Sequence, residues 1–350
     1  MQSGGSALHA DGPGTLITID PVMLPGLAVT GNVTLGANPL ATLGIGTSES
    51  VSTTGNQLVA TAVANQGFAQ LTGPVVSLAN AMVNGATDGP PDLITLTGPT
   101  SLAIPGPLLQ LTSSTLDNTT DSTRSTGGSL LSVSQSLLKT FGTAVPLIQL
   151  DQSTVKTQAH AVKIDAALLA ATAPLIKLVA GSTMTSNSDL VKLVQNARLT
   201  AHVPSDALIM LNASTLNVNG SLFNVAGGSS LNVTGNLVSL TNGSTLTLTN
   251  GALVSVSGGS AFNLTGSFGS FGTGTNAINL PTSDVFGGHA HTINTSLIPG
   301  YGVALGNGAA SSQVTVGGSF TPFTGIGGTN TVTPGGIVLH VDDTSHVGLH

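Results

Sequence analysis

Residues 237–256 read LVSLTNGSTLTLTNGALVSV, and this stretch decides the fold that the sequence predicts. It begins and ends with one four-residue pattern: two apolar residues, one variable residue and one aliphatic residue, as in Leu237–Leu240 and Leu253–Val256. Small polar residues and the alternating segment Thr245–Leu248 lie between the two copies. Alternation with a period of two is typical of a β-strand, and small polar residues are typical of turns. We therefore expect each repeat to form a strand, a tight corner, a second strand and a looser return.

The four-residue pattern recurs twelve times between residues 75 and 256. Its copies start at Val75, Leu93, Leu108, Leu130, Leu147, Ala161, Leu175, Leu190, Leu208, Leu222, Leu237 and Leu253. Successive starts lie 14 to 22 residues apart, which corresponds to a mean period of roughly 16. A unit this short cannot bury its apolar face alone, whereas stacking on its neighbours buries a continuous column.

The repeat predicts an all-β protein, a parallel β-solenoid (β-helix) with rungs of roughly 16 residues and an irregular Gly/Thr-rich C-terminal β region. If each rung formed one three-sided coil, its perimeter would be about 50 Å and the twelve rungs would stand about 60 Å tall. Helical repeats fit poorly because the chain holds 46 glycines. A propeller would need a period of about 40–50 residues.

The repeat also divides the chain into three predicted parts. Residues 1–74 hold imperfect copies and are expected to cap the N-terminal end, and residues 75–266 form the regular solenoid. Residues 267–350 are expected to cap the coil or to dock onto another subunit. A parallel stack leaves unpaired N–H and C=O groups at its ends, and lysine is a common residue for protecting them. Lys and Arg are absent from 1–123 and 199–350, which leaves the ends available for head-to-tail pairing unless terminal loops cover them.

Composition excludes several classes of protein. Seven Lys+Arg against fourteen Asp+Glu give a net charge of −7, so no basic surface for a nucleic acid is expected. The chain has no Cys, which rules out a disulfide scaffold and a thiolate metal site. No apolar stretch is long enough for a transmembrane helix, and the first residues lack the pattern of a signal peptide. We expect a secreted protein, extracellular or on the cell surface, whose leader is not present in this chain.

The sequence does not predict an enzyme. Glycosidases need paired carboxylates, but Glu49 is the only Glu and most Asp residues are scattered singly. No motif for a serine nucleophile, a zinc protease or a phosphate-binding loop is present. We therefore expect neither catalysis nor a cofactor.

Three lysines occupy the same outward position in consecutive copies of the pattern. They are Lys163, Lys177 and Lys192, with Gln149 at this position in the copy before Lys163. In a parallel stack they would form a ladder with a spacing of about 5 Å, suited to an anionic polysaccharide or a neighbouring subunit. The alternative, which we favour, is a solvated face whose charge nearby aspartates offset.

The C-terminal region contains candidate metal ligands. His289 and His291 form an H-x-H pair, which on a strand would point both rings to one face, and His340 and Asp342 would complete the set. Imidazole and carboxylate groups are ligands that zinc uses. The spacing matches no established metal motif, and the favoured alternative is partly buried histidine in a Gly-rich loop.

The repeated units with corners such as Asn242-Gly243-Ser244 resemble the large exoproteins and filamentous-haemagglutinin-like adhesins of bacteria. The resemblance covers about 75–265 and implies a secreted bacterial surface protein. The chain departs from that pattern in two ways: its rungs are shorter, and it has no convincing N-terminal secretion domain with Asn-Pro motifs. The resemblance therefore leaves the secretion route and the adhesion partner open.

Taken together, these patterns predict a structural subunit of an extracellular filament or surface layer. It would polymerise with itself, head to tail, through its solenoid ends or by strand addition. The alternative is a monomeric adhesin or polysaccharide-binding module that uses the flank with the three lysines. Ice binding would need regular Thr-x-Thr arrays, and Asn217, Asn232 and Asn263 interrupt the array that Thr245 to Thr249 begins.

Overall fold

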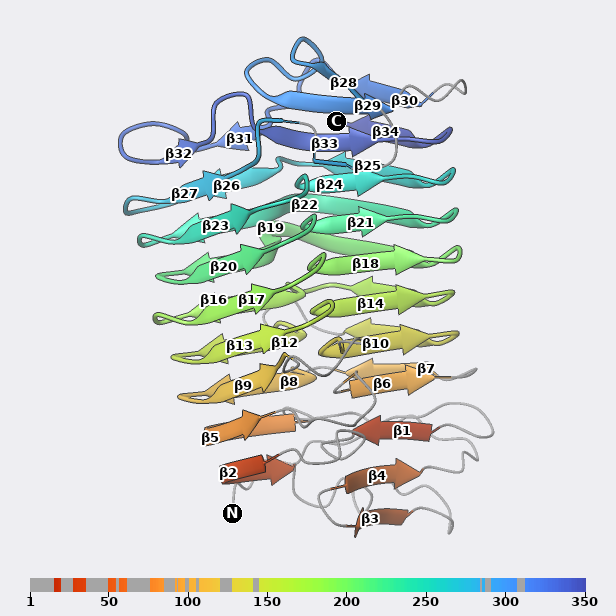
Figure 1. The fold of residues 1–350 in the computed structure, drawn as a ribbon, viewed down its shortest axis with the longest axis vertical. Helices are drawn as coiled ribbons and strands as arrows, with labels where there is room; N and C mark the ends of the chain where they lie inside the picture. Colours follow the sequence, from red (N-terminus) through yellow and green to blue (C-terminus); the bar gives the residue numbers. More distant parts are fainter. Residues whose placement is uncertain are drawn as a thin grey trace.

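The computed structural model is an all-β solenoid in which strands from successive turns lie parallel and stack along one axis (Figure 1). The structure describes residues 107–119, 128–140, 145–283, 285–286, 291–306 and 312–350, together with Asp92 and strands β1 to β7. These seven strands are β1 (Leu16–Ile19), β2 (Ala28–Leu35), β3 (Ser50–Thr54), β4 (Gln57–Thr61), β5 (Val76–Asn84), β6 (Ile94–Thr97) and β7 (Ser101–Ile104). Within the described residues, no helix is long and apolar enough to cross a bilayer.

Each regular turn contributes strand segments to four columns, named I to IV here. Column I contains β6, β10 (Leu131–Ser134), β14 (Val162–Asp165), β18 (Val191–Val194), β21 (Phe223–Val225), β24 (Val254–Val256) and β33 (Ile337–Val341). Column II contains β7, β11 (Leu137–Thr140), β15 (Leu168–Ala171), the first halves of β19 (Arg198–Asn212) and β22 (Ser230–Thr241), β25 (Ala261–Thr265), β34 (His346–Leu349) and β30 (Gln313–Val316).

The other two columns lie on the opposite side of the coil. Column III contains the start of β5, β8 (Leu109–Thr112), β12 (Ile148–Asp151), β16 (Ile176–Val179), the second halves of β19 and β22, β26 (Gly269–Phe271) and β31 (Phe323–Thr324). Column IV contains the end of β5, β9 (Thr115–Asn118), β13 (Thr154–Thr157), β17 (Thr183–Ser186), β20 (Thr215–Val218), β23 (Thr245–Leu248), β27 (Ala277–Asn279) and β32 (Thr331–Val332). Because β5, β19 and β22 each cross two columns, columns II to IV join into one 22-stranded sheet beside the 12-stranded sheet of column I.

The predicted solenoid class is confirmed, but the 16-residue unit is half of a turn. In column I, Leu131, Val162, Val191, Phe223 and Val254 are successive partners, and they lie 29 to 32 residues apart. Copies of the apolar pattern enter columns III and I alternately, and the shorter strands form columns IV and II. The expected three-sided coil of twelve rungs was therefore wrong, and about six turns cover residues 131–349.

Corner geometry explains why the pattern needs two adjacent apolar residues. Within a strand, neighbouring side chains point to opposite faces, so one of two adjacent residues should face solvent. Leu175 lies at the corner just before β16, and the bend there turns its side chain into the core beside Ile176 and Leu178, which are all 0% exposed. Lys177 takes the outward position.

Buried serines occupy the corners that lead into column IV. The hydroxyl of Ser153 donates to the carbonyl of Asp151 (2.7 Å) and accepts the backbone N–H of Ser114 in the turn before (3.0 Å). Ser182 in the next turn accepts the N–H of Ser153 in the same way (3.2 Å). Each hydroxyl thus satisfies a buried backbone group of a neighbouring turn, which explains the small polar residue at this position.

The C-terminal strands are inserted into the stack and do not simply extend it (Figure 1). After β27 the chain forms β28 (His291–Asn294), β29 (Gly302–Gly306) and β30. It then comes back and stacks directly on the turn formed by β24 to β27. There β33 lies between β24 and β29, and β34 lies between β25 and β30. This inserted turn therefore docks onto the chain's own solenoid.

Antiparallel strands close parts of both ends. At the C-terminal end β28 pairs with β29 in antiparallel fashion. At the N-terminal end β2 pairs with β5, β1 with β6, and β4 with both β1 and β3, all antiparallel. Parallel stacking thus stops at these strands.

Candidate metal centre

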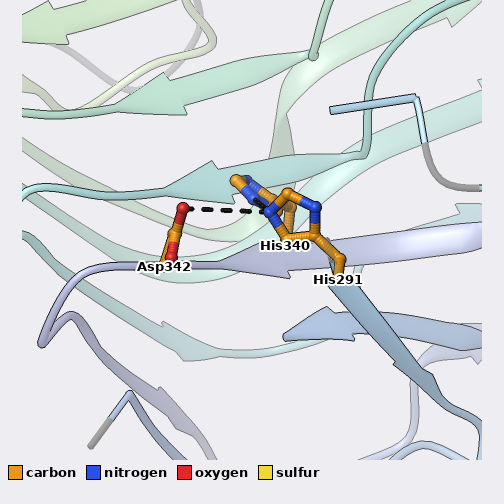
Figure 2. Close-up of side chains that lie close together, drawn as sticks. All are labelled: His291, His340 and Asp342. Atoms are coloured by element: carbon orange, nitrogen blue, oxygen red, sulfur yellow. Dashed lines mark hydrogen bonds and ion pairs between the residues drawn. The ribbon is translucent and has the colours of Figure 1, made fainter. Parts of the chain in front are cut away.

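Three side chains converge on the outer face of column I, at its C-terminal end (Figure 2). They are His291 at the start of β28, His340 in β33 and Asp342 just after β33, and one ligating atom of each lies within 4.8 Å of the others. The structure thus brings together three of the four predicted metal ligands. The fourth, His289, lies outside the described residues.

Strand register explains how residues from separated strands meet. His291 is the partner of Gly306, and Leu305 is the partner of Val341, so Gly306 lies between His291 and Asp342. Strands two apart in a sheet are separated by about 10 Å, so their side chains meet only when the middle strand leaves room. A Cβ atom on Gly306 would lie 2.0 Å from Oδ1 of Asp342. The glycine therefore provides the space that the carboxylate occupies.

His340 is held by three neighbours. Its Nε2 atom lies 2.9 Å from Nε2 of His291, and its Nδ1 atom lies 2.7 Å from the hydroxyl of Ser255 in β24. The ring of Phe286 stacks on the imidazole of His340, with centroids 3.8 Å apart and planes at 10°. These contacts fix the orientation of the ring.

The centre is largely withdrawn from water. His340 is 6% exposed, Asp342 is 7% exposed, and the side chain of His291 is 2% exposed. A small apolar cluster of Ala252, Ala304, Ile337, Phe286 and Ile293 lies on the same face. Oδ2 of Asp342 lies 3.8 Å from Nε2 of His291, and its Oδ1 accepts the N–H of Asp343 (3.0 Å).

Sequence reasoning missed Ser255, Phe286 and Gly306. Ser255 lies 85 residues before His340, and their contact depends on the insertion of β33 next to β24. The sequence repeat carries no signal for that insertion. The glycine was one of 46 in the chain, and only the strand register distinguishes it.

The predicted ladder of three lysines was wrong. Lys163 and Lys192 are direct partners in column I, but Lys177 lies in column III, between Gln149 and Met210. The error follows from the half-turn period, because consecutive copies lie on opposite sides of the coil. Lys163 is also paired with Asp165 (3.6 Å).

Beside this lysine pair lies the buried His160. Its Nδ1 atom lies 2.9 Å from the carbonyl oxygen of Asp189, which can only accept, so Nδ1 carries the proton. Burial lowers the pKa of His160, although the bond to Asp189 and the charge of that residue oppose the shift. Lys192 and Lys163 lower the pKa further, so neutral imidazole is favoured in the folded protein.

Comparison of the chain with protein-family models, with curated proteins and with solved structures finds no match. The predicted resemblance to bacterial exoproteins is thus supported only at the level of the shared fold. The chain is a parallel β-solenoid, with two histidines and an aspartate gathered at its C-terminal end.

Proposed function

We propose that this protein is a non-enzymatic structural subunit of an extracellular filament or surface layer, which grows by strand addition at the solenoid ends. The bacterial exoprotein-like adhesins that its repeats resemble fit this class. The role would be mechanical, since hydrogen bonds between turns and a continuous aliphatic core resist unfolding along the whole rod.

The observation that carries the proposal is the edge formed by β30, β31 and β32. Among the described strands, each of these three pairs with one neighbour only, namely β34, β26 and β27. Gln313 and Gly317 donate their N–H groups to Ser345 and Leu349. In a parallel pair the intervening N–H groups, those of Val314 and Val316, face the other side of β30, where a strand of another subunit can accept them.

The composition of this edge also supports the proposal. The sequences of the three strands are QVTV, FT and TV, without a charged residue. Natural proteins usually protect such edges with lysine, proline or a bulge. A subunit that repeats one heterologous contact of this kind forms an open filament.

The test is electron microscopy of the purified full chain over a range of concentrations, with one matched pair of variants. Thr315 in β30 and Thr200 in β19 are both exposed and occupy equivalent outward positions in column II, four turns apart. Thr315→Lys should abolish filaments, whereas Thr200→Lys, which adds the same charge far from the edge, should leave them intact. Discrete short rods of the unmodified protein at every concentration would overturn the proposal.

A monomeric adhesin that binds an anionic polysaccharide is the second candidate, favoured by the adjacent Lys163 and Lys192. Lys177 serves as a control because it lies on another sheet. The double variant Lys163→Ala/Lys192→Ala should lose binding to a sulfated polysaccharide, whereas Lys177→Ala should retain it. Equal binding by both variants would exclude this flank as the binding surface.

A further inference from the structure

We propose that His291, His340 and Asp342 form a binding site for a divalent transition-metal ion, best fitted by Zn²⁺, that fastens β28 to the inserted turn. His291 lies in β28, whereas His340 and Asp342 lie in β33 and just after it. Strand β29 separates β28 from β33, and the two histidines are 49 positions apart in the sequence. One shared ion would therefore cross-link β28 to β33. This inference goes beyond the filament proposal and does not depend on it.

The donor set selects the class of metal. Two imidazole nitrogens and one carboxylate oxygen suit zinc and its neighbours in the first transition row, whereas calcium and magnesium prefer sites made of oxygen ligands. Ligands about 2.0–2.2 Å from a tetrahedral zinc ion lie roughly 3–4 Å from one another. The separations of 2.9 Å between the two Nε2 atoms and 3.8 Å from His291 to Asp342 are close to that range. These three ligands from the described residues leave one position of a tetrahedral site open to a water molecule or another donor.

Charge balance points to a cation at the same place. The carboxylate of Asp342 is buried, and no lysine or arginine in the described part of the chain forms an ion pair with it. A buried charge is costly unless it is paired or coordinates a metal. A divalent ion held between the carboxylate and the two imidazoles meets this requirement.

The residues around the three side chains hold them in place, as the residues around a metal site do. Ligating histidines usually hold their second ring nitrogen in a hydrogen bond that fixes the ring orientation. Nδ1 of His340 has such a bond to Ser255, and Phe286 covers the ring. On β29, Gly306 leaves the space that the carboxylate of Asp342 fills.

The experiment measures Zn²⁺ binding by the full chain after treatment with a chelator, using calorimetry and metal analysis after dialysis. We expect one ion per chain and a melting temperature that rises with zinc concentration. Asp342→Asn and His291→Gln should each weaken binding about 100-fold or more, and Ser255→Ala about tenfold. Co²⁺ in place of Zn²⁺ should give the visible absorption of a tetrahedral site, and Asp342→Asn should lose it.

His346→Gln is the matched control, because His346 is an exposed histidine of the same region, in β34. It should bind Zn²⁺ as the unmodified chain does. Loss of affinity in this control equal to that of Asp342→Asn would overturn the proposal. The proposal would also be overturned if the unmodified chain retained no zinc after dialysis and had the same melting temperature with and without zinc. The three side chains would then be held together by hydrogen bonds alone. If Asp342→Asn fails to fold, Ser255→Ala decides between these outcomes.

Discussion

At the scale of single residues, His160 shows how one buried side chain can link the stability of the solenoid to pH. The residue is 8% exposed, and its ring donates a hydrogen bond to the carbonyl of Asp189. The folded protein favours the neutral ring because burial lowers the pKa of His160 from 6.5, and Lys163 and Lys192 act in the same direction. Protonation therefore costs more in the folded state than in the unfolded state.

This difference predicts a pH dependence with a defined sign. Above pH 6.5, the ordinary value for histidine, the ring is mostly neutral in both states and the stabilising effect is complete. As the pH falls below this value the unfolded state takes up the proton first, so the free energy of unfolding decreases until the pH passes the lowered pKa of the folded state. Urea unfolding between pH 7.5 and 4.5 should show this loss.

The variant His160→Asn isolates the contribution, because an amide N–H can donate to the carbonyl of Asp189 but does not titrate. Its stability should fall less steeply with decreasing pH than that of the unmodified chain. Parallel curves for the two proteins would show that the loss of stability at low pH comes from other groups.

At the scale of the structural element, hydrogen bonds of the corner serines connect successive turns of the solenoid. Ser153 is 2% exposed and bonds within its own turn and to both neighbouring turns. A second series of buried serines links neighbouring turns at the corners that lead into column II. There the hydroxyls of Ser260 and Ser345 accept the backbone N–H groups of Ser229 and Ser260. Further along the coil, the hydroxyl of Ser244 accepts the N–H of Ser214 at the same corner as Ser153.

Removing one hydroxyl should therefore be costly. Ser153→Ala leaves the buried N–H of Ser114 without its acceptor, and an unsatisfied buried donor costs about 1–3 kcal/mol. Ser205→Ala is the control, since Ser205 is exposed in β19, and it should change the free energy of unfolding by less than about 0.5 kcal/mol. Denaturant unfolding of both variants measures the difference, and equal effects would rule out a stabilising role for the serine series.

The repeat element was also the limit of what the sequence could predict. Residues such as Leu175 and Leu190 open nearly identical patterns, and both are buried, so apolar spacing alone cannot reveal that they lie on opposite sides of one turn. That distinction depends on the angles of the corners, which many small polar residues can form. The candidate metal ligands His291, His340 and Asp342 were predicted from their chemistry, but their contact depends on a strand insertion that has no periodic signal.

At the scale of the whole molecule, the inserted turn predicts an unusual order of protection. β33 has hydrogen-bonded neighbours on both sides although it lies close to the C-terminal end of the sequence, whereas β30, earlier in the chain, pairs with β34 only among the described strands. Amide protection reflects such pairing and burial rather than distance from a terminus.

Hydrogen exchange measured on dilute protein, where no filament forms, should therefore find β33 as protected as β24. The amides of Val314 and Val316 in β30 should exchange much faster. Fast exchange throughout β33 would contradict the insertion and would place this strand at the edge of the stack.

The position of β33 between β24 and β29 also sets an order in time. When a chain emerges N-terminus first, from a ribosome or through a secretion pore, β29 and β30 emerge before β33 and β34, the strands with which they pair. The solenoid can thus grow turn by turn as far as β27 and must then wait until residues 337–349 are available. A chain interrupted before that point keeps β24 and β25 unpaired on one side, so an incomplete product differs from a finished one in the strand edge that it offers to proteases and chaperones.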